Sequence, residues 1–233
     1  MPANFTLTTV REAWHLVGGL SDTSKMPGYS WGIPARYCNR GTKLREAKLP
    51  KGKRTVCSNC YGFGRGRYAM DEVDAAYERR LRKFMALGPE QWITGMNFLI
   101  QWYEGRYPYF RWCDMGDVQS LEMLEAFTVV AKSCQNSRFW LSTREVEIVG
   151  TWRAYHGPWP RNMRVRLSAD LIDGPAMVRL AKELGCGVAR VVTDGSHTCP
   201  ASRQKGHCLG AAHGGFDCYH CWSDQFEVVY PEH

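Results

Sequence analysis

The sequence has no run of about 18 apolar residues, the length that a membrane-spanning helix needs, so we expect no contact with a membrane. The first residues, MPANFTLTTVREAWHLVGG, do not show the basic start and apolar run of a secretory signal. Internal repeats and low-complexity tracts are absent as well. These absences predict a protein of the cytoplasm.

What the chain does have is enough apolar material for one sizeable core. It has 233 residues, of which 44% are hydrophobic and nine are Trp. A length of this order predicts a single domain spanning 1–233. Its composition divides it into an irregular, cysteine-containing and basic segment (1–70), an α/β core (71–198) and a cysteine-rich C-terminal segment (199–233).

The chain has ten cysteines, a number that needs an explanation in a protein expected to lie in the cytoplasm. That compartment keeps thiols reduced, so disulfides are not expected. A buried Cys can act as a small hydrophobe, and we assign that role to Cys113, Cys134 and Cys186. The other seven cysteines gather near the two ends of the chain, which packing alone does not require.

The formal charge of +7 is concentrated in residues 43–67, which hold eight Lys or Arg against one Glu. Such a segment suggests an anionic partner such as nucleic acid, and the alternative is a solvated, charged loop. Aromatic side chains that can stack on bases lie in and beside it. They are Tyr37, Tyr61, Phe63 and Tyr68.

From residue 71 onward, patterns of helix and strand alternate. Residues 1–37 are rich in turn formers and are expected to be irregular. Apolar spacings of three and four predict helices, and apolar runs that end in polar residues predict strands. The helices are predicted at 71–88, 90–105, 120–134 and 174–185, and the strands at 107–116, 138–145, 163–171 and 188–194, with only a short connection between the second and third strands. This alternation predicts an α/β fold with a parallel sheet, either open or a partial (β/α) barrel.

Each predicted strand ends in polar residues: CDMGD, STRE, SAD and TDGSH. In parallel α/β sheets ligands bind beyond the carboxyl ends of the strands, so these tips should share one site. We therefore predict that Asp117, Arg144 and Asp170 line one pocket near a metal and are candidate catalytic residues. The alternative is that they cap loops and form surface ion pairs.

The first cysteine group is Cys38, Cys57 and Cys60. The last two form a C-x-x-C pair, whose tight turn can point both sulfurs at one metal or cluster. A thioredoxin-like role expects such a pair after a strand, whereas this pair lies in the loop CSNCYGFGRGRY. Metal binding is therefore favoured. A cubane held by three thiolates keeps one iron open for a substrate or cofactor.

The second group is Cys199, Cys208, Cys218 and Cys221, four thiols within 23 residues that close with a C-x-x-C. Four thiolates suit a structural zinc or a [4Fe–4S] cluster, and spacing does not choose between them. Nearby histidines can replace a thiolate. They are His197, His207, His213 and His220. The two cysteine groups can also share one cluster if the ends of the chain meet.

The order of motifs resembles the phage "gene product 88" family over residues 24–233. The resemblance rests on SKMPGYSWGIPARYC, CSNCYGFGRGRY, FRWCDMGDVQS, FWLSTRE and the final CPA, C and CYHCW series. No activity is established for that family. The resemblance implies a phage-encoded protein that acts in a bacterial cytoplasm.

A weaker resemblance is to radical S-adenosylmethionine enzymes, which place three cysteines ahead of a parallel partial barrel. Cys38, Cys57 and Cys60 match in number and position, although eighteen residues separate the first two where the family has three. The resemblance implies that Gly116 and Asp117 bind the cofactor's methionine amine. The C-terminal cysteines then resemble a segment for an auxiliary cluster.

Three hypotheses follow from the residues. The first is an iron–sulfur protein with one or two clusters, of [4Fe–4S] type, acting as a redox protein or as an enzyme that uses S-adenosylmethionine. The second is a zinc-stabilised protein that binds nucleic acid through residues 43–67. The third is a structural zinc protein that binds another protein. Iron is favoured over zinc because a three-cysteine group beside an α/β sheet is seldom needed by zinc modules.

Overall fold

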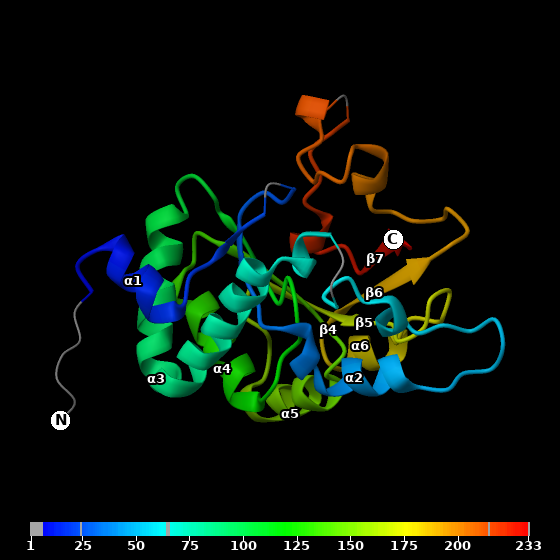
Figure 1. The fold of residues 1–233 in the computed structure, drawn as a ribbon, viewed down its shortest axis with the longest axis horizontal. Helices are drawn as coiled ribbons and strands as arrows, with labels where there is room; N and C mark the ends of the chain where they lie inside the picture. The colour runs from blue at the N-terminus through cyan, green and yellow to red at the C-terminus, as the bar shows by residue number, and fades with distance from the viewer. Residues whose placement is uncertain (1–6, 24, 64–65, 214, 233) are drawn as a thin grey trace.

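The computed structural model describes residues 7–23, 25–63, 66–213 and 215–232. At its centre is a seven-stranded sheet whose strands stand in their order along the chain (Figure 1). β1 (Ser21–Asp22) runs antiparallel to β2 (Tyr29–Trp31), and every later pairing is parallel. The later strands are β3 (Tyr109–Trp112), β4 (Arg138–Thr143), β5 (Met163–Ser168), β6 (Gly187–Val192) and β7 (Glu227–Pro231).

The expected α/β class with a parallel sheet is confirmed, and the sheet is open. Within the described residues, β1 pairs only with β2 and β7 pairs only with β6, so the two edges do not meet. Each new strand is added on the same side of the last one, which is the winding of a partial barrel. Such winding sends the connecting helices to one face and leaves the other face free for other segments.

Six α-helices surround this sheet, and their starts follow ordinary capping chemistry. They are α1 (Val10–Val17), α2 (Asn39–Glu46), α3 (Asp71–Tyr103), α4 (Leu121–Ser133), α5 (Val146–His156) and α6 (Val178–Glu183). The Ser120 side chain accepts a 3.1 Å hydrogen bond from Met123 N and so begins α4. The helices predicted at 71–88 and 90–105 are both present as parts of α3, which kinks at Gly88 (φ 72°) before Pro89.

Three expectations about the elements were wrong. Residues 1–37 are not irregular, because they contain α1, β1 and β2. The connection between β4 and β5 is not short but holds α5, and β1, β2 and β7 together bring the number of described strands from four to seven. The missed strands run for only two to five residues, too short for an alternating pattern, and the buried face of α5 consists of Val149 and Trp152 alone. Tertiary pairing decided these elements.

The main core lies between the helices and one face of the sheet. Trp112 is fully buried there, stacked on Phe127 of α4 at 4.2 Å and on Phe139 of β4 at 5.8 Å between ring centroids. Burying a side chain of this size is worth roughly 1.5–3 kcal/mol, so this aromatic layer supplies much of the driving force for folding. Cys113, Cys134 and Cys186 all belong to the same core, as the packing assignment expects.

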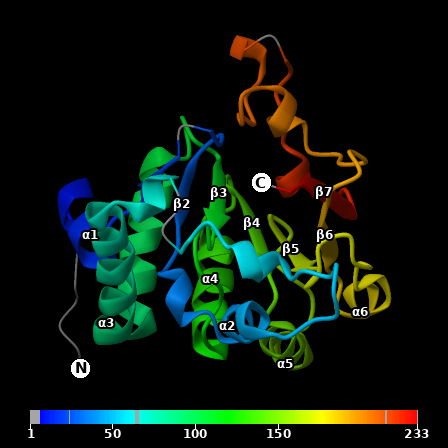
Figure 2. The ribbon, with the colours of Figure 1, turned by 45° about the vertical axis from the view of Figure 1, so that its right-hand side comes forward.

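The opposite face of the sheet carries polar and aromatic side chains instead of aliphatic ones. Arg111, Trp140 and Arg166 share it, because residues paired in register point to the same side. The chain between β6 and β7 covers this face, anchored by Trp222 Nε1, which donates to Phe110 O at 2.9 Å. Figures 1 and 2 both show this segment, in orange, rising away from the sheet before it returns to β7.

Candidate metal centres

The first cysteine group lies in the segment between β2 and α3. Cys38 directly precedes α2, and Cys57 lies in a short 3₁₀ helix, Val56–Asn59, that Cys60 ends. The Thr55 side chain begins this turn by accepting a 2.9 Å hydrogen bond from Ser58 N. Cys60 N in turn donates to Cys57 O at 3.3 Å. The C-x-x-C pair is therefore held on one tight turn, as its spacing predicts.

Cys38 and Cys57 converge on Gly41 although they are distant in sequence. A Cβ atom added at Gly41 would lie 2.9 Å from the Cys38 Cβ, 3.6 Å from the Cys38 sulfur and 3.7 Å from the Cys57 sulfur. Any side chain at this position would thus fill the space that the two sulfurs face. A glycine here keeps both thiols in reach of a common ligand.

Backbone contacts hold this segment against the carboxyl ends of the strands. Val56 N donates to Asp170 O at 2.8 Å, just beyond the end of β5, and Thr55 forms an isolated bridge with Leu171. Arg40 N at the start of α2 donates to Glu145 Oε1 at 2.8 Å, just beyond the end of β4. The first cysteine group therefore lies at the strand ends, where parallel α/β sheets bind their ligands.

Asp117 is buried beside this group and is fully hydrogen bonded. Its Oδ1 accepts from Val118 N at 2.8 Å and from the Thr143 hydroxyl at 2.5 Å, and its Oδ2 accepts from Arg144 N at 2.9 Å. Burial raises the pKa of Asp117, and these hydrogen bonds oppose the rise. The carboxylate thus ties the end of β3 to the end of β4 and positions the site.

Arg144 and Asp170 lie on the same side of the site as Asp117. Burial raises the pKa of the Cys57 thiol, the charge of Arg144 opposes the rise, and the charges of Asp117 and Asp170 add to it. Asp170 also forms an ion pair with Arg40. Arg144 Nε is buried and has no hydrogen-bond partner among the described residues. Asp117 thus ties two strand ends together, Asp170 is an ion-pair partner, and Arg144 keeps one polar atom without a partner among the described residues.

Gly116 has a local reason to be glycine. Its φ of +75° disfavours other residues, and an added Cβ would lie 2.5 Å from both the Cγ1 and the backbone oxygen of Ile33. Ile33 N in turn donates to Met115 O at 3.0 Å. The close approach at Gly116 is thus made by the chain that follows β2.

Cys113 packs in the main core, as expected, and its thiol also lies toward the first cysteine group. It follows β3 with a φ of +52°, rare for a residue with a side chain. Burial raises the pKa of its thiol well above the usual value, with Asp117 and Cys38 as the next contributors. In the sequence, Cys113 is the first residue of the polar strand end CDMGD, and this position indicates that it lies near the strand-end site.

The second cysteine group surrounds one small pocket. All four thiols line it, and the other lining residues are Pro200, Ala201, His220 and Val228. None of the first three cysteines lines this pocket, so the structure shows two separate groups. Cys208 N donates to Lys25 O at 2.7 Å, and Cys218 N donates to Cys208 O at 2.8 Å. These bonds bring the middle of the segment back toward the sheet.

Burial dominates the electrostatics of the second group. It raises the pKa of Cys208 to about 12 and that of Cys221 to about 11, while a contact with the Tyr230 hydroxyl lowers the latter. The Arg111 cation acts on both thiols in the opposite direction to burial. Neutral thiols are the stable form until a metal binds and displaces the protons.

The four nearby histidines differ in their placement. His220 lines the second pocket, and its Nδ1 is buried without a hydrogen-bond partner among the described residues. His197 Nε2 lies 2.9 Å from the Ser202 hydroxyl, and His207 also has a partner. The side chain of His213 falls outside the described part of the chain. His220 is thus the histidine best placed to add a ligand.

The donor set fits a thiolate-bound metal, although no coordination shell is formed. All ten cysteines are free thiols. Within the described residues, no three His, Cys, Asp or Glu side chains are arranged as ligands of a single metal ion. Thiols become ligands only on deprotonation, so metal binding and the final closure of such a site are coupled. The fit therefore rests on four thiols around one pocket and on the space that Gly41 leaves beside Cys38 and Cys57.

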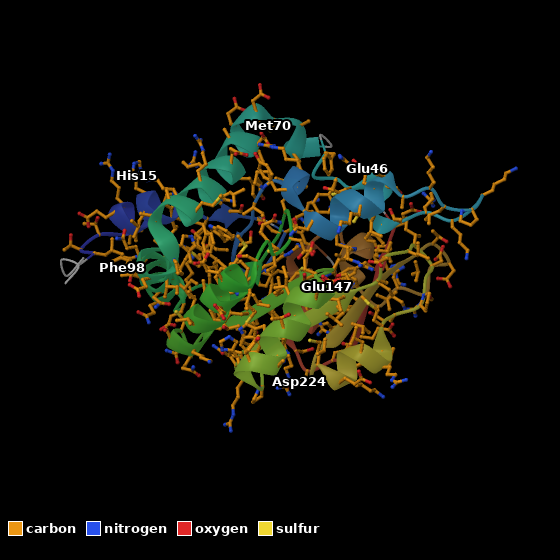
Figure 3. All side chains as sticks on the ribbon, turned by 90° about the horizontal axis from the view of Figure 1, so that it is seen from below. His15, Glu46, Met70, Phe98, Glu147 and Asp224 are labelled. Carbon is orange, nitrogen blue, oxygen red and sulfur yellow. The ribbon has the colours of Figure 1, made fainter. Side chains whose placement is uncertain are left out.

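The basic segment forms a loop beyond α2 whose lysines lie on the surface. Figure 3 shows the chain after Glu46 extending away from the body of the protein. The exposed cations are Lys43, Lys48, Lys51 and Lys53. Arg54 is instead paired with Glu232 at 2.6 and 2.8 Å, and Arg45 lies 3.8 Å over the Phe63 ring. Arg65 and the side chain of Arg67 fall outside the described residues.

Two of the four aromatics in this region are used for packing. The Tyr61 hydroxyl donates to Asp114 O at 2.9 Å, and its ring lies 5.1 Å from that of Tyr68. The Tyr61 ring is nevertheless as exposed as those of Tyr37 and Phe63. Three of the four aromatic side chains therefore reach the surface beside the basic segment.

Fold and site together define an open-sheet parallel α/β protein with two groups of free thiols, one at the strand ends and one against the polar face. The chain matches the family described as Gene product 88 over residues 21–229, and it belongs to that family. No curated protein and no solved structure matches it. Family membership confirms the first resemblance, and nothing supports the resemblance to radical S-adenosylmethionine enzymes. Among the described residues, no helix is long and apolar enough to cross a membrane.

Proposed function

We propose that the protein is an iron–sulfur protein whose C-terminal cysteines hold one cluster. The observation that carries the proposal is that Cys199, Cys208, Cys218 and Cys221 line one pocket whose other walls are largely apolar. Four thiolates are the usual ligand set of a [4Fe–4S] cluster, and apolar walls keep water away from it. Zinc bound by the same thiolates is the competing occupant.

Two buried cations beside this pocket favour an anionic occupant. Arg166 is 1% exposed and donates only to backbone carbonyls, and Arg111 has a buried Nε without a partner. Within the described residues neither arginine forms an ion pair. A buried cation without a counter-ion is costly, and a cluster with four thiolates carries the opposite charge.

The first cysteine group supports a second, more reactive centre in the same proposal. Cys38, Cys57 and Cys60 supply three thiolates, which leave one iron of a [4Fe–4S] cluster open to an amino-carboxylate such as that of S-adenosylmethionine. The Arg144 guanidinium, with its unpartnered Nε, is suited to hold the carboxylate. Asp117 serves as the positioning residue, since both its oxygens already accept hydrogen bonds.

The metal content is the direct test. The protein is purified anaerobically and analysed for iron, acid-labile sulfide and zinc. We expect brown protein with iron and sulfide, and loss of iron together with a lower melting temperature in Cys218→Ser and Cys221→Ser. Cys134→Ser, in the main core, is the matched control and keeps its iron. A colourless preparation with stoichiometric zinc and no sulfide would refute the proposal.

The open-iron centre needs its own test. The anaerobic protein is reduced and mixed with S-adenosylmethionine, and the paramagnetic resonance spectrum and 5′-deoxyadenosine are followed. We expect a changed spectrum in the wild type and none in Cys57→Ser. If the spectrum is unchanged and no cleavage product forms, the clusters carry electrons or support the fold, and the enzymatic part of the proposal is abandoned.

The exposed lysines support a second candidate, a zinc-stabilised protein that binds nucleic acid. Lys48, Lys51 and Lys53 lie on one projecting loop and Lys43 on the helix α2 that precedes it, and a basic surface of this kind meets phosphates. Binding of single-stranded and duplex DNA is measured at increasing salt. Replacing the four lysines with Gln should weaken binding and flatten its salt dependence, and unchanged binding would end this candidate.

A further inference from the structure

A pocket opens at the amino ends of β5 and β6, and none of the cysteines in the two groups lines it. Its walls come from four parts of the chain: the last turn of α5, the loop after α5 together with the start of β5 (158–166), the turn before β6 and the stretch Ser223–Phe226. The hollow holds about 780 Å³, including the space at its mouth. Figure 3 shows Asp224, at the rim, on the face seen from below.

The lining of this pocket is strongly basic. Four arginines line it, from α5, the loop and β5: Arg153, Arg161, Arg164 and Arg166. Asp224 is the only acid among the lining residues, and its side chain is 89% exposed where it pairs with Arg164. Three cations are therefore left without a carboxylate, and the pocket has a net positive charge that attracts an anion.

The arginines are held in place by bonds that do not cancel their charge. Arg153 Nε donates to Leu184 O at 3.2 Å, and Arg166 donates to Gln225 O at 2.5 Å and Phe226 O at 3.1 Å. Carbonyls are neutral, so each guanidinium stays a full cation in a fixed orientation. Arg164 Nε is buried without a hydrogen-bond partner among the described residues. A donor of this kind is expected to be satisfied by a ligand.

Two aromatic side chains complete the walls. Trp159 is fixed by a 2.9 Å hydrogen bond from its Nε1 to Leu184 O and by stacking on Trp152 at 4.0 Å. Phe226 is 36% exposed on the other side. Gly185 is required by its φ of +65° in the turn before β6, and an added Cβ would make only ordinary contacts with Arg153 and Trp159. The pocket thus offers apolar surface beside fixed cations.

We propose that this pocket binds a phosphate-bearing small molecule with a planar ring, of the mononucleotide class. Guanidinium groups bind phosphate through paired hydrogen bonds, and aromatic side chains give a planar ring a surface on which to pack. None of the seven clustered cysteines lines this site, and Arg166 is the residue that it shares with the surroundings of the second cysteine group.

The test is calorimetric titration of the full chain with adenosine monophosphate, inorganic phosphate and adenosine. We expect the nucleotide to bind more tightly than either fragment and to weaken as salt is raised. Arg161→Ala and Arg164→Ala should each raise Kd about tenfold, the equivalent of ~1.4 kcal/mol. Arg161 is exposed, so its replacement is not expected to disturb folding, and circular dichroism checks this point.

Arg179→Ala is the matched control, since the Arg179 side chain is 95% exposed on α6 and does not line the pocket. It should bind the nucleotide as the wild type does. The quenching of tryptophan fluorescence by the nucleotide should be smaller in Trp159→Phe. Absence of nucleotide binding, equal affinity for adenosine, or equal Kd values in the Arg161 and Arg179 variants would overturn the proposal.

Discussion

The Tyr230 hydroxyl lies 3.2 Å from the Cys221 sulfur and links β7 to the second cysteine group. Both groups are buried, and burial raises the pKa of each, that of Cys221 to about 11. A thiolate has no proton to donate. If Cys221 binds a metal as a thiolate, the Tyr230 hydroxyl therefore donates the hydrogen bond to the sulfur. The last strand of the sheet is therefore in direct contact with the proposed cluster ligand.

Replacing Tyr230 with Phe removes this donor. A hydrogen bond to a ligating sulfur stabilises the more negative, reduced state of a cluster, so its loss should lower the reduction potential. We expect a fall of about 60 mV, the one-electron equivalent of ~1.4 kcal/mol. Spectroelectrochemical titration measures it, with Tyr155→Phe as control because Tyr155 is 78% exposed. Equal potentials in the two variants would contradict the contact's role.

Arg166 holds the C-terminal segment against the sheet. From β5 it donates to backbone carbonyls between His220 and Phe226, among them His220 O at 2.9 Å and Ser223 O at 3.2 Å. Arg166→Met removes the donors that tie these carbonyls to β5, which should lower the free energy of unfolding by about 2–4 kcal/mol. Hydrogen exchange should be faster in residues 220–226. Arg138→Met, at the exposed start of β4, should change neither quantity, and unchanged exchange in the Arg166 variant would refute the anchoring role.

The buried carboxyls at the strand ends predict how stability depends on pH. Burial raises the pKa of Asp117 above 3.8 and that of Glu145 above 4.5. A carboxyl with a raised pKa binds its proton more tightly in the folded than in the unfolded chain. The contribution of such a carboxyl to the free energy of unfolding is fully present below its pKa in the unfolded chain. It is lost as pH rises through the pKa of the carboxyl in the folded chain. Urea unfolding should therefore show a decline in this contribution from about pH 4 upward.

Asp117→Asn tests the same prediction at one residue. The amide cannot titrate, so part of the decline should vanish. An amide NH₂ facing Arg144 N in place of Oδ2 should also cost about 1–3 kcal/mol at neutral pH. Glu90→Gln, on the surface of α3, serves as control and keeps the wild-type profile. A profile in Asp117→Asn that matches the control at every pH would contradict the assignment.

Substitution by Ala should change the free energy of unfolding in opposite directions at two glycines. At Gly116 the φ of +75° and the 2.5 Å approach of Ile33 O make a Cβ unacceptable, and we expect a loss of at least ~2 kcal/mol. At Gly150, inside α5, an added Cβ meets nothing within 4 Å, and we expect a gain of about 0.5–1 kcal/mol. Urea unfolding of both variants measures the difference. Similar stabilities would show that Ile33 moves aside.

The parallel α/β pattern could be predicted from the sequence because its main helices and inner strands are long enough to show a periodic pattern. The stripe from Val73 to Met85 and the cap at Ser120 are local signals, and α3 and α4 follow them. The helix α1 carries an equally local signal, the capping box of Thr9 and Glu12, but the many turn formers that follow it favour an irregular segment. The strands β2 and β7 carry no such signal, since they exist only through pairing with β3 and β6.

By itself, the sequence determined the class of fold, the two groups of cysteines and the polar ends of the strands, because periodicity, spacing and strand polarity are local properties of the chain. Only the tertiary structure decided that the two cysteine groups are separate and that Cys113 lies beside Cys38. It also decided that both carboxylate oxygens of Asp117 accept hydrogen bonds, from backbone N–H groups and from Thr143. It also formed the arginine pocket from four distant segments. Contacts between residues far apart in the chain depend on how helices and strands pack, and no local pattern encodes them.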